Sequence, residues 1–543
     1  MFPRRPDGVA QTWRNIVIKR FIEGMKTAER RRVFYALLGG KALGIGLLML
    51  IIWGVPHYFG HPALADDAAA APPPAYVNPI NNMWTLITAF LVFFMQAGFM
   101  FLEAGFARTR ETVNVLLEGI VDTCLCGLLF WAWGFAFMFG AGNGFIGHQF
   151  FFLHGAPDTY GSTGIALPAF FLFQYAFADT CSTITSGAMI GRTGFVGDLV
   201  YSFFVSGFIY PIFGHWAWGP DGWLATMGSD GNFFPSLGTS FHDFAGSTVV
   251  HSIGGFVALA GAIVLGPRLG RRFKRDGGGP MLPHDLTIAT VGGFILWFGW
   301  YGFNPGSTLS AMDFEGIGRI ATNTTLAACA AGLAAMFYAY PKTRTWDVSF
   351  TVNGFLAGLV AITCPCYWVS PTGAVLLGAV AGVIVVVAVD VLEYLRIDDP
   401  IGAVPVHGIC GIWGTLSLGL FACGQFGSTG PMAADNSAPL TGLFYGGGFT
   451  VLTAQIIGSA AICGSVFVTT MIMMYAIHAF GLLRVSTAGE LEGLDLHEHG
   501  VPAYPEYALH GSAAPQGAPA FTDAAYGAEA RAAMAQAQKM AHS

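Results

Sequence analysis

Two histidines and one aspartate occupy or adjoin long apolar segments, where ionisable side chains are rare. His251 ends the segment Asp243-Phe-Ala-Gly-Ser-Thr-Val-Val-His, and His407 lies in Val404-Pro-Val-His-Gly-Ile-Cys-Gly. An ionisable group inside a bilayer costs roughly 2.5–3.5 kcal/mol on insertion scales, so it marks a functional site by default. Each neutral imidazole offers one donor and one acceptor, so the two could hydrogen-bond and relay a proton. These residues predict a path for protons, ions or a small polar solute.

Two other interpretations of the histidines stay open at this point. The first is a pair of satisfied core histidines that only pack. The second is a pair of haem ligands, but bis-histidine haem sites in membranes usually use paired histidines on facing helices. Here each segment carries one deep histidine, so haem is disfavoured.

The composition indicates an integral membrane protein. Of the 543 residues, 54% are hydrophobic and only 10% are charged, whereas a soluble domain carries about 25% charged residues. Apolar runs of about 20 residues suit membrane helices and not the ~10-residue alternating strands of an outer-membrane barrel. The 74 glycines favour close packing between helices. Most of the nine cysteines fall inside apolar runs and are interpreted as small core residues.

The first 65 residues have two interpretations. Nine basic residues precede an apolar run from Val33 to Val55, and Pro62-Ala-Leu-Ala65 offers a small-residue cleavage site. These features predict a signal peptide with a long basic start, and an uncleaved extra helix is the alternative. Both place the polar linker 66–81 outside the cytoplasm.

The apolar pattern predicts an all-α integral membrane domain over residues 82–483. Eleven spans are expected, at 82–106, 112–140, 165–190, 195–218, 243–266, 285–306, 317–340, 347–364, 372–395, 402–423 and 446–482. Eleven transmembrane helices leave room for two inverted five-helix repeats plus a final helix, an arrangement that commonly places the site at mid-membrane. His251 and His407 fall in the fifth and tenth spans, which agrees with such repeats.

The basic residues predict the orientation. With the linker outside, alternation of the spans assigns twelve basic residues to the inner side: Arg108, Arg110, Arg192, Arg268, Arg271, Arg272, Lys274, Arg275, Lys342, Arg344, Arg396 and Arg484. Arg319 alone falls near an outer loop. This bias follows the positive-inside rule and predicts an external N-terminus and a cytoplasmic C-terminus. Residues 484–510 are then a cytoplasmic regulatory tail, and the Ala/Gln-rich residues 511–543 a disordered low-complexity tail.

Aromatic and hydroxyl side chains gather at the predicted outer ends. Trp218 ends the fourth span, while Trp300, Phe303 and Ser307 close the sixth. Aromatic faces attract a cation by roughly 0.5–2 kcal/mol, so with Asp243 nearby we expect a cation-recruiting site. An interfacial aromatic belt is the alternative for the two tryptophans. Asp243 is also a candidate helix N-cap, which is compatible with an electrostatic role.

The remaining acidic residues in the spans are less informative. Glu103 and Asp390 lie close to inner ends, where their side chains could reach water, and Asp122 and Asp179 have no partner that the sequence identifies. A phosphate-binding loop, a nucleophile elbow in workable context, a HExxH motif and a CxxC pair are absent from the sequence. The chain is therefore not expected to be an enzyme, and no cofactor, metal or nucleic-acid partner is predicted.

Three long motifs, in order along the chain, resemble the ammonium transporter (Amt) family. They are Asp243 to His251, Trp297-Phe-Gly-Trp-Tyr-Gly-Phe-Asn-Pro-Gly-Ser307, and Arg396-Ile-Asp-Asp-Pro400 continuing to His407-Gly-Ile-Cys-Gly411. The resemblance covers about residues 80–507. It implies eleven transmembrane helices with an inverted repeat, and a homotrimer with one pore in each subunit. We expect this assembly in the inner membrane of a bacterium, serving nitrogen uptake.

The resemblance also implies roles for single residues. Trp218, Phe303 and Ser307 correspond to the family's outer ammonium site, which Asp243 supports, and His251 and His407 correspond to its twin-histidine pore. The segment Leu491-Glu-Gly-Leu-Asp-Leu-His-Glu-His-Gly500 is similar to the family's inner tail. That similarity implies packing of the tail under neighbouring subunits and docking of a PII-type regulator.

One position departs from the family pattern. Some members carry a phenylalanine in the third span that gates the pore beside Phe303. The matching stretch here is Phe177-Ala-Asp-Thr-Cys181, which places a cysteine at that position. We therefore expect a wider entry that is closed mainly by Phe303.

The expected function is ammonium transport. NH4+ recruited at the outer aromatic site loses a proton, NH3 passes the two histidines, and the proton crosses separately along them. An apolar lumen would exclude both NH4+ and the similar K+ ion. An Rh-like channel that passes NH3 without net charge is one alternative, and Trp218 and Ser307 favour the transporter over it. The other alternative is an ammonium sensor that signals through its tail, although the ~60 residues after 484 are too few for an appended enzymatic domain.

Overall fold

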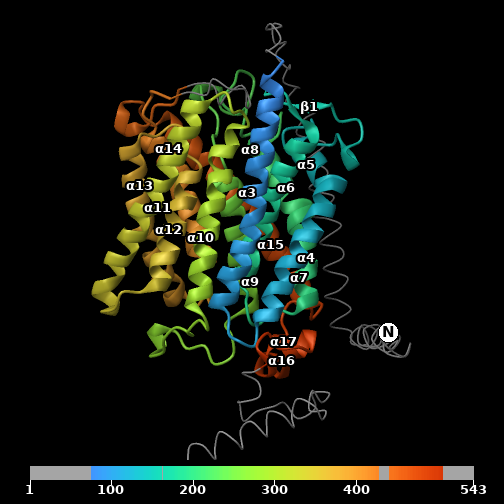
Figure 1. Ribbon diagram of the computed structural model, residues 1–543, viewed down its shortest axis with the longest axis vertical. Coiled ribbons are helices and arrows are strands. Elements are labelled where there is room, and N and C mark those ends of the chain that lie inside the picture. Colours follow the sequence, from blue (N-terminus) through green and yellow to red (C-terminus); the bar gives the residue numbers. More distant parts are fainter. Residues whose placement is uncertain (1–74, 162, 427–438, 506–543) are drawn as a thin grey trace, which may run out of the picture. The chain divides into compact units, whose positions relative to one another are not determined.

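The computed structural model describes residues 75–161, 163–426 and 439–505, all within the unit Asp66–Ser543. These residues form a bundle of long helices (Figure 1). The predicted signal peptide or extra helix at 1–65, most of the linker 66–81 and the predicted disordered tail 511–543 lie outside the described residues.

Most of the described chain is helical. The α-helices are α3 (Val77–Phe106), α4 (Thr112–Leu129), α5 (Phe135–Phe139), α6 (Leu167–Gly187), α7 (Phe195–Phe204), α8 (Tyr210–Trp218), α9 (Ile253–Leu265), α10 (Leu286–Phe303), α11 (Phe314–Thr343), α12 (Val348–Thr363), α13 (Pro371–Leu395), α14 (Cys410–Phe421), α15 (Thr450–Ala479), α16 (Thr487–Glu492) and α17 (Leu494–His499). Wider π-helical turns join or begin some of them: η1 (Phe130–Gly134), η3 (Val205–Ile209), η5 (Ser247–Ser252) and η8 (Val404–Ile409). Short 3-10 turns are η2 (Phe151–Leu153), η4 (Pro235–Leu237), η6 (Lys274–Asp276), η7 (Pro305–Thr308) and η10 (Leu443–Tyr445), and β1 (Thr159–Tyr160) pairs antiparallel with β2 (Ile165–Ala166).

Each of the eleven predicted spans overlaps a helical segment, but not every segment has membrane length and apolarity. In the described part of the chain, nine helices are long and apolar enough to cross a membrane. The other two segments are α12, which has only 16 residues, and α6, which carries Asp179 and several hydroxyl side chains. The number of membrane crossings therefore stays a prediction.

Several helices begin or end a few residues away from the predicted boundaries. Helix α3 begins at Val77, inside the predicted linker. The fifth helical segment begins at Ser247 and not at residue 243, because Gly246 takes a left-handed conformation (φ 110°) that ends the preceding loop. Asp243 therefore stands before the helix.

Small residues let neighbouring helices approach closely, as the glycine content predicts. Where α11 meets α13, a Cβ atom on Gly382 would lie 2.2 Å from the carbonyl oxygen of Ala331. Where α11 meets α12, a Cβ atom on Gly358 would lie 2.5 Å from the carbonyl oxygen of Ala327. Only glycine permits these backbone contacts, which are typical of helix packing in membranes.

Basic residues from alternate loops meet at one end of the bundle, the lower end in Figure 1. Arg268, after α9, forms two hydrogen bonds of 2.8 and 2.9 Å with the carboxylate of Asp398, after α13. Arg271 pairs with Glu393. Burial alone would raise the pKa of the Asp398 carboxyl, but the hydrogen bonds and charge of Arg268 outweigh it and hold this pKa well below its usual range. The network ties two distant loops together.

The first part of the tail docks against the same end of its own chain. The guanidinium of Arg484 donates to the carbonyl oxygen of Pro267 at 2.9 Å and pairs with Glu490. In α17, Asp495 accepts a hydrogen bond of 3.0 Å from the backbone N–H of Asn114, at the start of α4. Residues 484–505 are therefore part of the folded structure.

Candidate functional site

The imidazoles of His251 and His407 meet in the interior of the bundle. Their Nδ1 atoms are 3.2 Å apart, and their ring centroids are 5.2 Å apart. His251 is fully buried in η5, and His407 is 5% exposed in η8. An Nδ1–Nδ1 contact requires one ring to carry its proton on Nδ1 while the other accepts. The contact that the sequence predicted for these two side chains is therefore present.

A glycine crossing brings the two histidines together. Gly255 of α9 follows His251 by one turn, and Gly408 directly follows His407. A Cβ atom on Gly255 would lie 2.2 Å from the backbone nitrogen of Gly408 and 2.4 Å from its Cα. The two backbones can touch only because Gly255 has no side chain.

Asp243 prepares the turn that carries His251. Its carboxylate accepts hydrogen bonds of 2.8–3.0 Å from the backbone N–H groups of Gly246, Ser247, Thr248 and Val249. These are the groups that a helix start leaves without partners. Gly246 and not Asp243 is the N-cap residue of this segment. The Asp243 side chain nevertheless supplies the cap from three residues earlier, and the capped turn holds His251 in place.

Asp399 caps the turn that carries His407 in the same way. This role was not predicted from the sequence. Its carboxylate accepts bonds of 2.8–3.3 Å from the four backbone N–H groups of residues 401–404. Burial raises the pKa of Asp399 above its usual range, against the effect of these four bonds. The signal was available: each aspartate stands eight residues before a histidine, and each is followed after three residues by a glycine with positive φ, Gly246 or Gly402.

Aromatic rings form a continuous stack above His251. The ring of Trp300 stacks on His251 at 5.1 Å between centroids, and the ring of Phe303 stacks on it at 5.3 Å. Trp300 is fully buried, and its indole N–H donates to Thr363 at 2.9 Å. Trp300 thus lies beside the histidine and not at an open vestibule.

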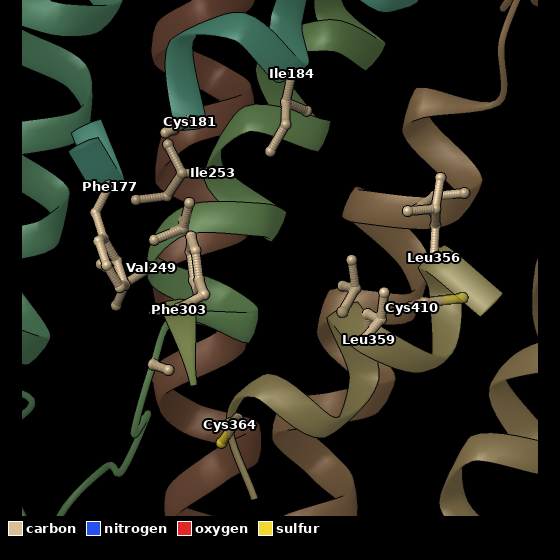
Figure 2. Packing of buried hydrophobic residues seen from close by; sticks show 14 of the residues in the cluster. Phe177, Cys181, Ile184, Val249, Ile253, Phe303, Leu356, Leu359, Cys364 and Cys410 are labelled. Carbon is tan, nitrogen blue, oxygen red and sulfur yellow. The ribbon is translucent and has the colours of Figure 1, made fainter. Parts of the chain in front are cut away.

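Phe303 has a ring partner, although the sequence predicted a wider entry closed mainly by Phe303. Phe177 of α6 stacks on Phe303 with centroids 4.0 Å apart and planes 24° apart. Figure 2 shows the two rings side by side next to Val249, with Cys181 further along α6 beside Ile253. The expected gate position therefore carries no ring, because it is occupied by Cys181. Phe177, one helical turn earlier, supplies the partner instead.

Trp218 and Ser307 complete the predicted outer group. Trp218 is half-buried and meets Phe177 edge to face at 6.1 Å. Its indole N–H donates to the backbone carbonyl of Asp243 at 2.7 Å. The hydroxyl of Ser307 donates to the carbonyl of Phe303 at 2.8 Å, which leaves its oxygen lone pairs to accept. The structure therefore brings Trp218, Phe177 and Phe303 into one group.

Together these side chains form an apolar column of rings, in which the imidazole pair of His251 and His407 is the polar element. From Trp218 the contacts run through Phe177 and Phe303 to His251 and His407, and the ring of Phe99 lies 6.3 Å from His407. The Nε2 atom of His251 has no hydrogen-bond partner among the described residues. Such a column can offer a small neutral solute hydrogen bonds at the imidazoles and resists any ion that must keep its water shell.

A family model described as the Ammonium Transporter Family matches residues 83–504. The chain belongs to this family. Ammonium transporter Amt2 of Archaeoglobus fulgidus is 44% identical over 79% of this chain and 89% of that protein. Ammonium transporter 1 member 2 of Arabidopsis thaliana is 40% identical over 74% of this chain and 79% of that protein. The chain is thus a multi-pass membrane protein of a family of transporters.

Solved structures of ammonium transporter relatives have the same fold. A protein named Sensor Amt Protein matches with a TM-score of 0.69 at 35% identity, covering 78% of this chain and 99% of that one. Mep2 of Candida albicans matches with a TM-score of 0.67 at 29% identity, covering 82% of this chain and 93% of that one. Both matches extend over most of each chain, so they concern the whole helix bundle.

Proposed function

We propose that this ammonium transporter family member recruits NH4+ at the aromatic group around Trp218, removes a proton from it, and conducts NH3 past His251 and His407. The observation that carries the proposal is the 3.2 Å contact between the two imidazoles at the end of a column of stacked rings. An imidazole pair is a polar contact for NH3 and a relay for a proton.

Recruitment rests on the outer group. The aromatic faces of Trp218 and Phe177 attract a cation, and the hydroxyl oxygen of Ser307 accepts a hydrogen bond from it. The carboxylate of Asp243 is occupied by four backbone N–H groups. Its contribution is a fixed negative charge beside the group and a rigid backbone carbonyl for the Trp218 indole.

Selectivity follows from the stacked rings. Phe177 and Phe303 are fully packed on each other, so a solute enters only when they move apart. A K+ ion in the column would lose its water without gaining matching oxygen ligands. NH4+ can leave its proton behind and continue as neutral NH3, an option that K+ lacks.

The proposal includes the wider architecture. The repeated Asp, Gly and His spacing in η5 and η8 supports two inverted repeats within eleven transmembrane helices. We further propose a homotrimer in a bacterial inner membrane, with an external N-terminus, a cytoplasmic C-terminus and a PII-type protein as its regulator. The gathering of basic residues at the tail-bearing end supports this orientation.

Purified full-length protein in liposomes tests the function. An ammonium gradient should produce a transient current together with a change of internal pH, and an equal potassium gradient should produce neither. Two variants are needed: one in which His251 and His407 are both replaced by acidic residues, and one in which both are replaced by apolar residues. If current and potassium exclusion persisted unchanged in both variants, the histidine relay would be wrong. Rapid NH3 flux without current would instead support the electroneutral channel.

A sensor is the second candidate, because the tail contacts the helices that surround the site. Arg484 and Glu490 bind the loop after α9, the helix continuous with the His251 turn. One of the matching solved proteins is also named Sensor Amt Protein. A sensor would expose or release residues 484–505 when ammonium binds. Protection of the tail backbone from hydrogen exchange, measured with and without ammonium, distinguishes this candidate from a transporter whose tail stays docked.

A further inference from the structure

Five carboxyl groups on α3, α4, α6 and α7 are buried in the helix bundle. They are Glu103, Glu118, Asp122, Asp179 and Asp198, each at most 5% exposed. None of them forms an ion pair within the described residues. Burying five unpaired negative charges would cost far more than a fold can supply, so these groups hold protons between them. The prediction that Glu103 reaches water is wrong.

Hydroxyl and amide side chains form hydrogen bonds around Asp122, at the centre of these groups. Asp122 accepts hydrogen bonds from Ser182 at 2.6 Å and Thr183 at 3.3 Å. Thr183 lies 2.9 Å from the side-chain oxygen of Gln96, and Ser206 lies 3.1 Å from Ser182. The result is a branched polar chain across four helices.

A second branch reaches the tail. Glu118 stands one turn from Asp122 on α4 and accepts a bond of 2.8 Å from Asn114. The other side of Asn114 meets the imidazole Nε2 of His499 in α17 at 2.9 Å. Glu103 accepts from Ser186 at 3.0 Å, and Tyr201 donates to Asp198. The carboxyl chain therefore ends beneath the docked tail.

Several polar atoms in the chain have no partner among the described residues. They are both carboxyl oxygens of Asp179, Oδ2 of Asp198, Nε2 of Gln96 and the hydroxyl of Tyr210. Asp179 and Tyr210 are fully buried, and Tyr210 stands one turn beyond Ser206. Buried polar atoms are almost always hydrogen-bonded, and exceptions point to internal water or a mobile proton.

Helix α6 separates this chain from the histidine column. Phe177 faces the column, and the adjoining α9-facing surface of α6 is formed by Cys181 and Ile184, which lie against Gly254. Asp179, Ser182 and Thr183 occupy the opposite surface. On α3, Gln96 belongs to the polar chain, whereas Phe99 one turn later lies beside His407. The two paths run alongside each other without sharing a residue.

We propose that this carboxyl–hydroxyl chain carries protons between the middle of the helix bundle and the tail-covered end, along a path separate from the two histidines. The inference rests on the proposed function, because it assigns part of the proton movement to a second path. Its support is the unpartnered buried oxygens of Asp179, the hydrogen-bonded connections through Asp122, and the exit at Asn114 and His499.

Each step moves one proton. A carboxyl group accepts a proton on one oxygen and releases another from its second oxygen, and a hydroxyl or water passes one O–H proton on while it accepts the next. Where the path leaves through Asn114 and His499, the amide or imidazole takes up a proton on one atom and releases another from its N–H group. Only O–H and N–H bonds form and break, so no oxidant or co-reactant is needed. The titratable groups that face the carboxyl–hydroxyl chain are Glu103 from α3, Glu118, Asp122 and Cys126 from α4, Asp179 from α6, Asp198 and Tyr201 from α7, Tyr210 from α8, and Asp495 and His499 from α17.

The test uses full-length protein in liposomes and measures NH3 flux and ammonium-triggered current separately. The variant Asp122→Asn with Glu118→Gln keeps the shape and removes the proton-carrying groups. Its current should fall clearly below the wild-type level, to the part that the histidine pair carries, while its NH3 flux stays at the wild-type level. Asp390→Asn is the matched control, because Asp390 is an acidic residue that forms ion pairs and does not belong to the carboxyl–hydroxyl chain. The NH3 flux and the current should both persist in this variant.

The outcomes separate this inference from the proposed function. Wild-type protein that moves no ammonia contradicts the proposed function. Normal ammonia flux with a wild-type current in the Asp122→Asn, Glu118→Gln variant contradicts the carboxyl path alone. Ammonia flux without any current in the wild-type protein contradicts both the histidine relay and the carboxyl path.

An infrared experiment decides the case if the variant does not fold. Adding ammonium to wild-type protein should change the carbonyl-stretch absorption of protonated carboxyl groups. Ser182→Ala, which removes one hydrogen bond to Asp122, should shift that band. No ammonium-dependent change in the carboxyl region would overturn the inference.

Discussion

Asp243 and Asp399 occupy equivalent positions in two separate helical segments. Each lies eight residues before a histidine of the pair, and each caps four backbone N–H groups at the start of a π-helical turn. The histidines therefore meet because two similarly built turns face each other. Substitution of Asp399 and substitution of Asp243 should accordingly affect the pair in the same way.

Replacement of Asp399 by asparagine should loosen the turn that carries His407. Asparagine retains one acceptor oxygen but lacks the charge that holds four N–H groups, and loss of a helix cap costs about 0.5–2 kcal/mol. We expect a lower melting temperature and reduced ammonium current. Asp347→Asn is the control, because Asp347 caps α12 with one hydrogen bond far from the histidines. Equal effects of both substitutions on current would argue against a positioning role for Asp399.

Replacement of Gly255 by alanine should separate the two histidines. The added Cβ would lie 2.2 Å from the backbone of Gly408, so the helices must move apart, at a cost of typically 1–3 kcal/mol. Ammonium current should be lost. Gly408→Ala is the matched control, since its Cβ would meet Gly255 at an ordinary 3.5 Å. The crossing would be unimportant for transport if both variants behaved alike.

Replacement of Trp218 by leucine should weaken recruitment of the cation. Loss of roughly 0.5–2 kcal/mol of cation–π attraction raises the half-saturating ammonium concentration about 2- to 30-fold. The maximal current should change less than the half-saturating concentration. Trp216→Leu serves as the control, because Trp216 donates to the carbonyl of Phe145 and packs on Phe213, away from the ring stack. An unchanged half-saturating concentration in Trp218→Leu would remove this residue from the site.

Replacement of Phe177 by alanine should open the entry. Phe303 then loses the ring that stacks on it at 4.0 Å, and water can enter the space. We expect a potassium current that wild-type protein does not show. Phe170→Ala removes a buried ring of the same helix that stacks on Tyr160 instead, and it should remain selective. Exclusion of potassium by Phe177→Ala would mean that Phe303 closes the entry without help.

The Asp398–Arg268 pair should make stability depend on pH. Because the pKa of Asp398 is held below its usual range, its stabilisation is complete above the unfolded value near 4 and is lost as pH falls below it. Asp398→Asn should leave the buried Arg268 unpaired, at a cost of about 3–5 kcal/mol, and should flatten the acid side of the profile of melting temperature against pH.

The control for this pair is an exposed one. Arg396 and Asp276 lie at the surface, where ion pairs contribute little, so Asp276→Asn should leave the profile nearly unchanged. A wild-type acid limb that persisted in Asp398→Asn would assign it to another carboxyl group.

The sequence does not by itself determine in which direction each side chain points from its helix. Each residue turns about 100° around a helix axis, so small errors in register change which side chains meet. Phe177 was passed over because Cys181 occupied the expected gate position, yet the ring one turn away reaches Phe303. Glu103 lies near a helix end, where the sequence predicts contact with water, but its side chain is buried and accepts a hydrogen bond from Ser186 of α6.

The sequence by itself determined the apolar helical segments, the basic end and the histidines with their aspartate. A backbone in hydrocarbon must satisfy its hydrogen bonds within the helix. The length and polarity of each span can therefore be recognised from its own stretch of sequence. Only the tertiary structure decided that the imidazoles touch at 3.2 Å, that Phe177 joins Phe303, and that five carboxyl groups share a buried chain. These contacts join residues far apart in the chain, and they depend on how each helix is rotated and how closely glycine lets it approach its neighbour.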